Sequence, residues 1–290
     1  MTAAVPTVRL AKYHGLGNDF LVMIVADGEI APDDVSHEEL ARASCDRHRG
    51  IGADGLLVCS SADVETGADL RMRLRNADGS LAEMSGNGIR CFVHAALDAG
   101  LVQPGVIVIS TDGGLRTVDA GPPIDGVVHV NVSMGTLGCD TIEIPGSVQA
   151  LIGDRRAATV SVGNPHIVID AHPSTVELET FGPAIEQWYL ASDHHGINVE
   201  VIGASPNEQD VIDMAVWERG VGITQSCGTG AVASAAVAHA WGLVGTRSIV
   251  RQPGGDAVVV LDGAEARLIG YSQFICAADF AVPPGVNIHG

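Results

Sequence analysis

Apolar and polar positions divide the chain into many short β-type runs and two longer Ala-rich segments. Each short run is rich in β-branched residues and is bounded by turn signals such as Asp112-Gly113-Gly114 and Pro253-Gly254-Gly255, which predicts strands. The predicted strands are Leu56–Cys59, Val106–Ser110, Val127–Val132, Thr159–Val162, His166–Ile169, Asn198–Val201, Val211–Trp217, Ser248–Val250 and Ala257–Leu261.

The two Ala-rich segments, 85–99 and 227–241, predict helices. Each begins at a polar residue followed by Gly-x-Gly and ends at a glycine suited to a left-handed C-cap. The second segment is apolar around nearly its whole circumference, so we expect neighbours on all sides of it. Because strands precede and follow each helix without strictly alternating with helices, the pattern favours an α+β fold over a doubly wound sheet.

These helices belong to an internal repeat. Residues 85–102 read SGNGIRCFVHAALDAGLV and residues 227–244 read CGTGAVASAAVAHAWGLV, so that both glycines of Gly-x-Gly and the final Gly-Leu-Val match at one offset. Matches in the same order at a constant offset indicate two homologous halves. We therefore predict two domains related by a pseudo-twofold axis, each a curved, mostly antiparallel sheet wrapped around a central buried helix, with the active site in the cleft between them.

The domain boundary is predicted in the Pro- and Gly-rich segment Ala120–Asp125. The N-terminal half then comprises residues 1–124 together with a C-terminal strand at about 274–282, and the C-terminal half comprises 125–273. Residues 283–290 are predicted to form a flexible tail.

Composition narrows the class of protein. The 290 residues are 46% hydrophobic and carry 35 acidic against 16 basic residues, a formal charge of −19 without a Lys/Arg cluster, which argues against nucleic acid. The chain has no apolar run long enough for a membrane span and no signal-peptide core, so we expect a cytoplasmic protein without a membrane partner. Six dispersed cysteines without a CxxC pair argue against a metal site or a disulfide framework.

Two homologous helix starts suggest chemistry. The first turn of a helix offers unpaired N–H groups and a positive dipole end, and glycines there let an anion approach the backbone. Two such starts facing one cleft would hold a carboxylate, and the dipole would lower the pKa of a thiol at the N-cap, where Cys227 lies. An inert N-cap cysteine is the plain alternative. Neither helix start is a phosphate-binding P-loop, because the lysine of that motif is missing. Gly228–Ala233 matches the Gly-x-Gly-x-x-Ala pattern of a dinucleotide-binding loop, but no strand runs directly into it, as that fold requires.

Six segments carry a resemblance to a known family. They are Gly15–Phe20 (GLGNDF), Asn76–Ser80 (NADGS), Gly86–Cys91 (GNGIRC), Gly163–His166 (GNPH), Ile197–Glu200 (INVE) and Glu218–Gly230, which holds Glu-Arg-Gly and Cys-Gly-Thr-Gly. In this order, and over nearly the whole chain, they resemble diaminopimelate epimerase, a cofactor-independent amino-acid epimerase. Proline racemases and phenazine-type isomerases are similar in fold but lack Asn-Ala-Asp-Gly-Ser and Glu-Arg-Gly at these places.

The resemblance implies an isomerase of lysine and peptidoglycan-precursor biosynthesis that interconverts LL- and meso-2,6-diaminopimelate by two-base proton transfer, without pyridoxal phosphate or metal. One catalytic group would be Cys227 and the other would occupy position 85. The implied substrate-binding residues are Asn18, Asn76, Gly86, Asn87, Asn164, Asn198, Glu218, Arg219, Gly228 and Thr229, with His166 in a supporting role. Arg219 would pair with the distal carboxylate. A homodimer is left open. Without the resemblance, each asparagine reads as a residue that caps its own turn.

Position 85 departs from the family pattern, which has cysteine before Gly-Asn-Gly where this chain has Ser85. A hydroxyl is a far weaker acid than a thiol of pKa about 8.5, so thiolate chemistry is lost on that side. Cys91 is no substitute, because six residues along a helix span about 9 Å and point elsewhere. Three interpretations stay open: an introduced Cys-to-Ser change, a natural variant in which Ser85 donates a proton or positions water, and a one-base relative such as a hydroxyproline-type dehydratase or epimerase.

Overall fold

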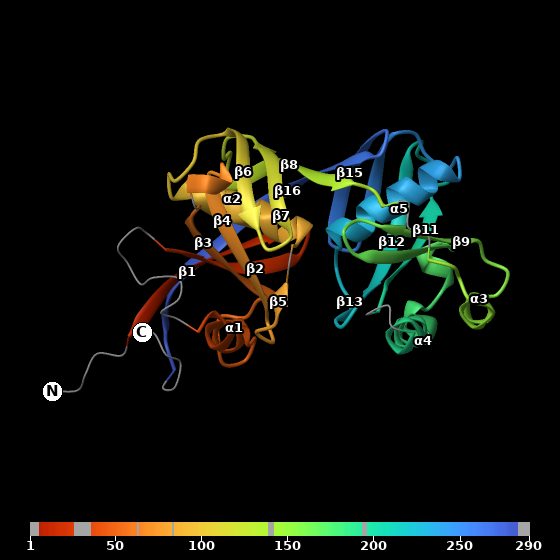
Figure 1. The fold of residues 1–290 in the computed structure, drawn as a ribbon, viewed down its shortest axis with the longest axis horizontal. Coiled ribbons are helices and arrows are strands. Elements are labelled where there is room, and N and C mark those ends of the chain that lie inside the picture. Colours follow the sequence, from red (N-terminus) through yellow and green to blue (C-terminus); the bar gives the residue numbers. More distant parts are fainter. Residues whose placement is uncertain are drawn as a thin grey trace. The chain divides into compact units, whose positions relative to one another are not determined.

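The computed structural model describes residues 6–25, 36–62, 64–82, 84–138, 142–192 and 196–283 (Figure 1). The chain forms two compact units. The first contains the residues up to Val132 together with those from Tyr271 onward, and the second is Ser133–Gly270. Helices and mostly antiparallel strands coexist in both, which confirms the α+β prediction. Of the predicted tail, 284–290 lie outside the described residues. No helix in the described ranges is long and apolar enough to cross a membrane.

The first unit contains the elements from β1 to β7, the first part of β8 and the C-terminal part of β16. In chain order the elements up to β8 are β1 (Thr7–Gly15), β2 (Asn18–Ile24), α1 (His37–Cys45), β3 (Gly55–Ser61), η1 (Val64–Thr66), β4 (Leu70–Asn76), β5 (Leu81–Ala82), α2 (Gly86–Asp98), β6 (Gly105–Thr111), β7 (Gly114–Ala120) and β8 (Val127–Thr136). The elements that follow are α3 (Gly146–Ile152), β9 (Ala157–Ser161), β10 (Pro165–Asp170), η2 (Pro173–Thr175), α4 (Leu178–Ala191), β11 (Asn198–Ala204), β12 (Val211–Glu218), β13 (Gly222–Ile223), α5 (Gly228–Ala240), β14 (Arg247–Gln252), β15 (Gly255–Asp262) and β16 (Glu265–Ala281).

The two halves share one topology. The strand order is β1-β2-β3-β4-β6-β7-β8 in the first half and β9-β10-β11-β12-β14-β15-β16 in the second. Equivalent pairs are parallel in both, namely β2–β3 with β10–β11 and β4–β6 with β12–β14. A strand of two residues precedes each of these helices: β5, paired with β4, precedes α2, and β13, paired with β12, precedes α5. The repeat predicted from the sequence is therefore confirmed as a repeat of topology.

The Pro- and Gly-rich segment Ala120–Asp125 does not mark the join between the units. It forms the turn between β7 and β8, closed by a bridge between Ile124 and Val127, inside the first unit. The chain instead changes unit within two long strands, after Val132 in β8 and after Gly270 in β16. The change of unit lies inside a strand, so no change in composition marks it. The nearby Pro- and Gly-rich turn resembles a linker, and the boundary was therefore predicted at 124/125.

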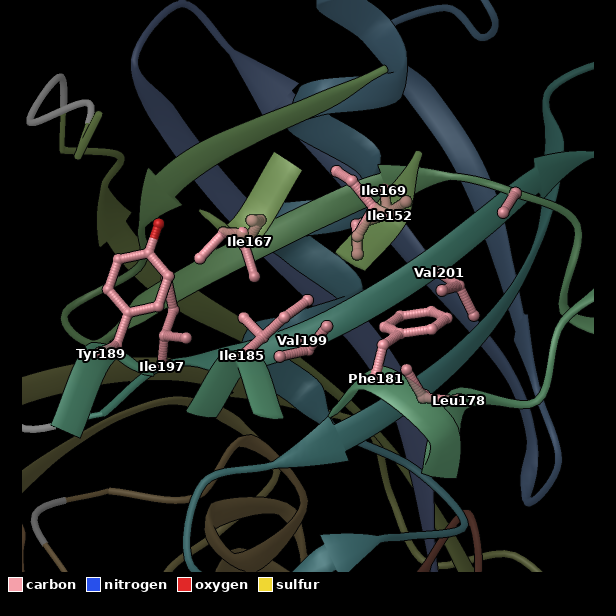
Figure 2. Packing of buried hydrophobic residues seen from close by; sticks show 12 residues of the cluster. Ile152, Ile167, Ile169, Leu178, Phe181, Ile185, Tyr189, Ile197, Val199 and Val201 are labelled. Carbon is pink, nitrogen blue, oxygen red and sulfur yellow. The ribbon is translucent and has the colours of Figure 1, made fainter. Parts of the chain in front are cut away.

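Alternation along β10 and β11 determines what each face of these strands meets. Ile167 and Ile169 of β10 lie with Val199 and Val201 of β11 on the face covered by α3 and α4, in the cluster of Figure 2. Successive side chains of a strand point to opposite faces. His166 and Glu200 therefore point to the other face of these strands, where α5 packs. Both faces are buried, so polar groups there need internal partners.

Helices α2 and α5 form where the sequence places them. α2 packs against β1, β2, β3 and β4, whereas α5 packs against strands from β9 to β15 and buries residues on all sides. Helices α1, α3 and α4 were not predicted. In α4 the pair Gly182-Pro183 reads as a loop, yet Pro183 lies inside the helix.

Candidate active site

The starts of α2 and α5 have the same local geometry. Ser85 is the N-cap of α2, with φ −135° and ψ 126°, and Cys227 is the N-cap of α5, with φ −129° and ψ 118°. Each side chain accepts a hydrogen bond from the backbone N–H three residues on: Gly88 N to Ser85 Oγ at 3.0 Å, and Gly230 N to Cys227 Sγ at 3.3 Å. The hydroxyl and the thiol are therefore structural equivalents, each held at the positive end of a helix.

In the second unit, the backbone around Cys227 is fixed by neighbouring polar groups. Its N–H donates to Gln252 Oε1 at 2.8 Å, and its sulfur lies 3.6 Å from Thr229 Oγ1. The Thr229 hydroxyl in turn accepts from Asn164 Nδ2 at 3.5 Å. The predicted residues Asn164, Cys227 and Thr229 therefore form one contiguous group.

A buried His–Glu pair lies behind this group. His166 and Glu200 are both fully buried, and His166 Nδ1 is 2.7 Å from Glu200 Oε1. The other ring nitrogen, Nε2, lies 3.0 Å from Asn164 Oδ1. His166 thus connects the buried carboxylate of Glu200 to Asn164. A Cβ on Gly230 would come within 2.7 Å of Glu200 Oε1, so Glu200 packs directly against the first turn of α5.

Glu218 is the last residue of β12 and Arg219 follows it, with its backbone N–H held by Asn198. Asn198 Oδ1 accepts from the Arg219 N–H at 3.0 Å, and Asn198 Nδ2 donates to the Pro165 carbonyl at 3.0 Å. Glu218 Oε1 accepts from the Thr224 hydroxyl at 2.5 Å. The side chain of Asn198, at the start of β11, therefore joins the start of β10 to the residue that follows β12.

The electrostatics of Cys227 contradict the prediction of a lowered thiol pKa. Burial raises the pKa of Cys227 well above its ordinary value, and the carboxylates of Glu218 and Glu200 raise it further. The hydrogen bonds from Thr229 and the Gly230 N–H act in the opposite direction but are outweighed. Burial likewise raises the pKa of Glu218, with Glu200 adding to the effect. The raised pKa therefore favours the thiol form of Cys227 at neutral pH.

In the first unit, hydrogen bonds connect the start of α2 to the β2 loop. Asn87 is buried and its Nδ2 donates to Asn18 Oδ1 at 3.3 Å. Asn18 Nδ2 donates to Asp54 Oδ2 at 2.6 Å. Burial would raise the pKa of the adjacent Asp19, but hydrogen bonds from Arg47 and Lys12 outweigh this effect and lower it. Two predicted substrate ligands, Asn18 and Asn87, are thus in direct contact.

Asn76 and Cys91 are the remaining predictions for this unit. Asn76 closes its own turn: its Nδ2 donates to Ser80 Oγ at 3.0 Å and its N–H to the Ser80 carbonyl at 2.9 Å. Cys91 is fully buried inside α2, and burial raises the pKa of its thiol to about 12. Cys91 is therefore a core residue, as expected, and takes no part in the surface at Ser85.

Sequence analysis missed four polar residues that support these sites: Asp54, Arg90, Glu200 and Gln252. Glu200 and Arg90 lie within two of the family motifs, INVE and GNGIRC. Each could have been recognised as a charged residue at a position that the strand or helix pattern assigns to the core. Asp54 and Gln252 had no such signal, because only tertiary contacts bring them to the site. Among the described residues, no group of three or more His, Cys, Asp or Glu side chains is placed to hold a metal ion.

Solved structures define the class of fold to which this chain belongs. A phenazine biosynthesis protein of the PhzF family from Bacillus anthracis superposes with a TM-score of 0.71, at 15% identity over 94% of this chain and 99% of that one. A hydroxyproline epimerase from Agrobacterium vitis gives 0.70, at 19% identity over 96% and 93%. The chain thus has the two-domain fold shared by PhzF-type proteins and racemases or epimerases of this kind.

Sequence comparison then gives the family. The sequence profile described as Diaminopimelate epimerase matches residues 10–137 and 158–272. Diaminopimelate epimerase of Desulfitobacterium hafniense is 38% identical over 266 residues, covering 87% of this chain and 90% of the relative. The Corynebacterium glutamicum protein of that name is 37% identical over 290 residues, covering 95% and 99%. The chain belongs to the diaminopimelate epimerase family, as the sequence motifs predicted.

Proposed function

We propose that this protein is a diaminopimelate epimerase that interconverts the LL and meso isomers of 2,6-diaminopimelate by proton transfer at one α-carbon, without a cofactor. The relatives of 36–38% identity carry this name over most of the chain. The observation that carries the mechanism is the equivalence of Ser85 and Cys227, two proton-bearing N-caps on repeated helices. The alternative of a hydroxyproline-type enzyme is less favoured, because the structures of that kind match only at 19% identity.

Inversion at carbon requires one group on each side of the substrate. We therefore propose that the two repeated helix starts act on one substrate molecule, held in a cleft between the halves around their pseudo-twofold axis. Cys227 would take the α-proton: the Cα–H bond breaks, its electron pair stays on the substrate and an S–H bond forms. The charge that develops on the carboxylate would be stabilised by N–H groups near Gly86, Asn87, Gly228 and Thr229.

Cys227 must be a thiolate to take the α-proton, and bound substrate can lower the pKa of its thiol. Burial, together with the negative charges of Glu218 and Glu200, raises the pKa of the free thiol and keeps it protonated. An ammonium group of diaminopimelate placed against Glu218 would offset part of this charge and lower the pKa of the thiol. The base would then form only with substrate bound. Arg219, whose backbone Asn198 holds, is the proposed partner of the distal carboxylate.

Ser85 would return a proton on the opposite face. Its O–H bond would break as the new Cα–H bond forms, leaving an alkoxide that must be reprotonated from water. Because a hydroxyl is a much weaker acid than a thiol, we expect this half of the reaction to limit net epimerisation.

The test incubates LL- and meso-diaminopimelate separately in deuterated water and scores α-deuterium by mass spectrometry and the other isomer by chiral chromatography. The expected result is enzyme-dependent deuteration of at least the isomer whose α-hydrogen faces Cys227, which Cys227→Ala abolishes and which Cys59→Ala, a change at a buried cysteine of β3, retains. The proposal is wrong if neither isomer is deuterated, or if the deuteration survives in Cys227→Ala.

A further inference from the structure

A buried arginine near the start of α2 has no counterpart in the other half. Arg90 is fully buried and is among the largest fully buried side chains, and the matching position of the repeat in α5 is Val232. Within the described part of the chain its Nε and NH1 atoms have no hydrogen-bond partner, and no carboxylate lies within ion-pair distance of it. Burying a guanidinium without an ion pair is costly, so a core role alone does not explain this residue.

The hydrogen bond that Arg90 makes within the described part of the chain leads to the candidate site. Its NH2 group donates to Asn87 Oδ1. A guanidinium has donors only, so the atom of Asn87 that faces it must be the oxygen, which fixes the amide orientation. The Asn87 NH₂ group then points to Asn18 Oδ1, at 3.3 Å.

At the Asp54 end of this series of hydrogen bonds, the donor-to-acceptor direction is also determined. Asn18 Nδ2 donates to Asp54 Oδ2 at 2.6 Å, and Asp54 is held by Arg47 at 2.7 Å. A carboxylate only accepts, just as the guanidinium only donates. Both asparagine amides are therefore oriented in one sense, from Arg90 at one end to Asp54 at the other.

The position and charge of Arg90 also act on the helix start. Burial lowers the pKa of Arg90 to about 10, so the side chain is still a cation at neutral pH. Gly15 leaves room for it, because a Cβ there would lie 3.2 Å from the Arg90 NH2 group. A cation inside the first turns of α2 adds to the positive dipole end, whereas Glu200 beneath α5 opposes it.

We propose that Arg90 is a positioning residue of the substrate site: it orients the amides of Asn87 and Asn18 and makes the start of α2 the stronger of the two carboxylate-binding helix ends. The identity of the ligand, diaminopimelate, rests on the proposed function. The orientation of Asn87 does not, and it is tested without any ligand.

The ligand-free arm measures the side-chain amide signals of Asn87 and Asn18 by ¹⁵N–¹H NMR in the wild type, Arg90→Lys, Arg90→Met and Arg9→Met. Arg9 is an exposed arginine paired with Asp279 and serves as the control for loss of one charge. We expect hydrogen exchange of the Asn87 amide to quicken at least about tenfold in Arg90→Met, and less in Arg90→Lys, which keeps a donor. Unchanged exchange in folded Arg90→Met, or in Arg90→Lys if the Met variant does not fold, overturns the proposal.

The second arm measures diaminopimelate binding and α-deuterium exchange in the same variants, in Asn87→Ala, and in the double variant that combines Arg90→Met with Asn87→Ala. Arg90→Met should lower kcat/KM at least about tenfold with the effect on kcat exceeding that on KM, and its loss should be less than additive with Asn87→Ala. Additive losses would show that Arg90 does not act through Asn87. If the wild type neither binds nor exchanges diaminopimelate, the proposed function fails, while the NMR result still decides the role of Arg90.

Discussion

The state of Cys227 is set by neighbours that are distant in the sequence. The start of α5 and two hydrogen bonds favour the thiolate, but burial and the carboxylates of Glu218 and Glu200 have the larger effect and raise the pKa of Cys227. The helix start carries only a partial positive charge, so in a buried site it affects the pKa less than the two full negative charges of the carboxylates. An N-cap cysteine is thus a proton donor or a base according to which charges surround it.

This balance predicts the reactivity of the thiol. Below pH 9, and without substrate, iodoacetamide should label Cys227 at least about tenfold more slowly than the exposed Cys276, because alkylation requires the thiolate and the raised pKa keeps it scarce. Glu218→Gln removes one raising charge, so it should lower the pKa and speed the labelling of Cys227. The measurement is peptide mass spectrometry of labelling rates between pH 6 and pH 10.

Glu208→Gln is the matched control, because Glu208 is a half-exposed glutamate of the same unit that pairs with Arg251. It should leave the labelling of Cys227 unchanged. Equal labelling rates for Cys227 and Cys276 in the wild type at pH 7 would refute the account of the raised pKa.

The N-cap positions of Ser85 and Cys227 could be predicted from the sequence, but their charge environment could not. The Gly-x-Gly helix starts and the repeat were sufficient to place Cys227 and Ser85 as N-caps, and the structure bears this out. The raised pKa was missed because Glu200 and Glu218 approach the thiol through the strands β11 and β12. A local pattern contains the helix dipole and omits such carboxylates.

At the scale of the element, the glycines of the two helix starts are needed for close packing. Gly230 lies between Cys227 and Glu200, and a Cβ there would come within 2.7 Å of Glu200 Oε1 and 3.2 Å of Cys227 Sγ. In α2, a Cβ on Gly88 would come within 3.0 Å of the Ser85 Cβ. A side chain at the third residue of each helix would thus crowd the helix's own N-cap, and in α5 also a buried carboxylate.

Gly230→Ala should therefore be destabilising although alanine is the better helix former. We expect a loss of about 1–3 kcal/mol in the free energy of unfolding, the usual cost of overpacking, measured by urea denaturation. Gly146→Ala is the control: Gly146 also opens a helix, α3, but an added Cβ there meets no atom within 4 Å. That variant should be neutral or slightly stabilised. Equal stability of the two variants would contradict the packing argument.

Elements with a strong local signal were predicted, and elements formed by tertiary contacts were not. Helix α5 follows from its Ala-rich, uniformly apolar sequence, and its predicted burial is observed. Helix α4 was hidden by Gly182-Pro183, although Phe181 and Ile185 pack into the core on β10 and β11 (Figure 2). Burial of that apolar face outweighs the local cost of the proline.

At the scale of the whole molecule, the chain is a repeat whose halves have diverged at the N-caps of the repeated helices. The topology of β1 to β8 recurs in β9 to β16, and the N-cap geometry recurs with it. The side chains differ: Ser85 and Cys227 occupy equivalent positions of the repeat, as do Arg90 and Val232. The sequence revealed the duplication but misplaced the join, because the connection between units runs along the uninterrupted strands β8 and β16.

The difference between Ser85 and Cys227 predicts unequal half-reactions for a two-sided epimerase. The stereoisomer that presents its α-hydrogen to Cys227 should exchange it with deuterated water, since a thiolate can form on that side. The isomer that presents its hydrogen to Ser85 should exchange much more slowly, because a hydroxyl is a poor base at neutral pH. Initial exchange rates of LL- and meso-diaminopimelate, measured separately by mass spectrometry, give the ratio.

Net epimerisation should nevertheless be slow in both directions, because one equilibrium constant links the forward and reverse rates. Ser85→Cys should accelerate it by about 10²–10⁴-fold, the usual contribution of a general acid or base. Ser85→Ala gives the matched comparison, since it removes the hydroxyl and leaves the helix start without a side-chain cap. If both isomers exchange equally fast with Ser85 in place, another group serves that face, and the assignment of position 85 as the second proton-transfer site is wrong.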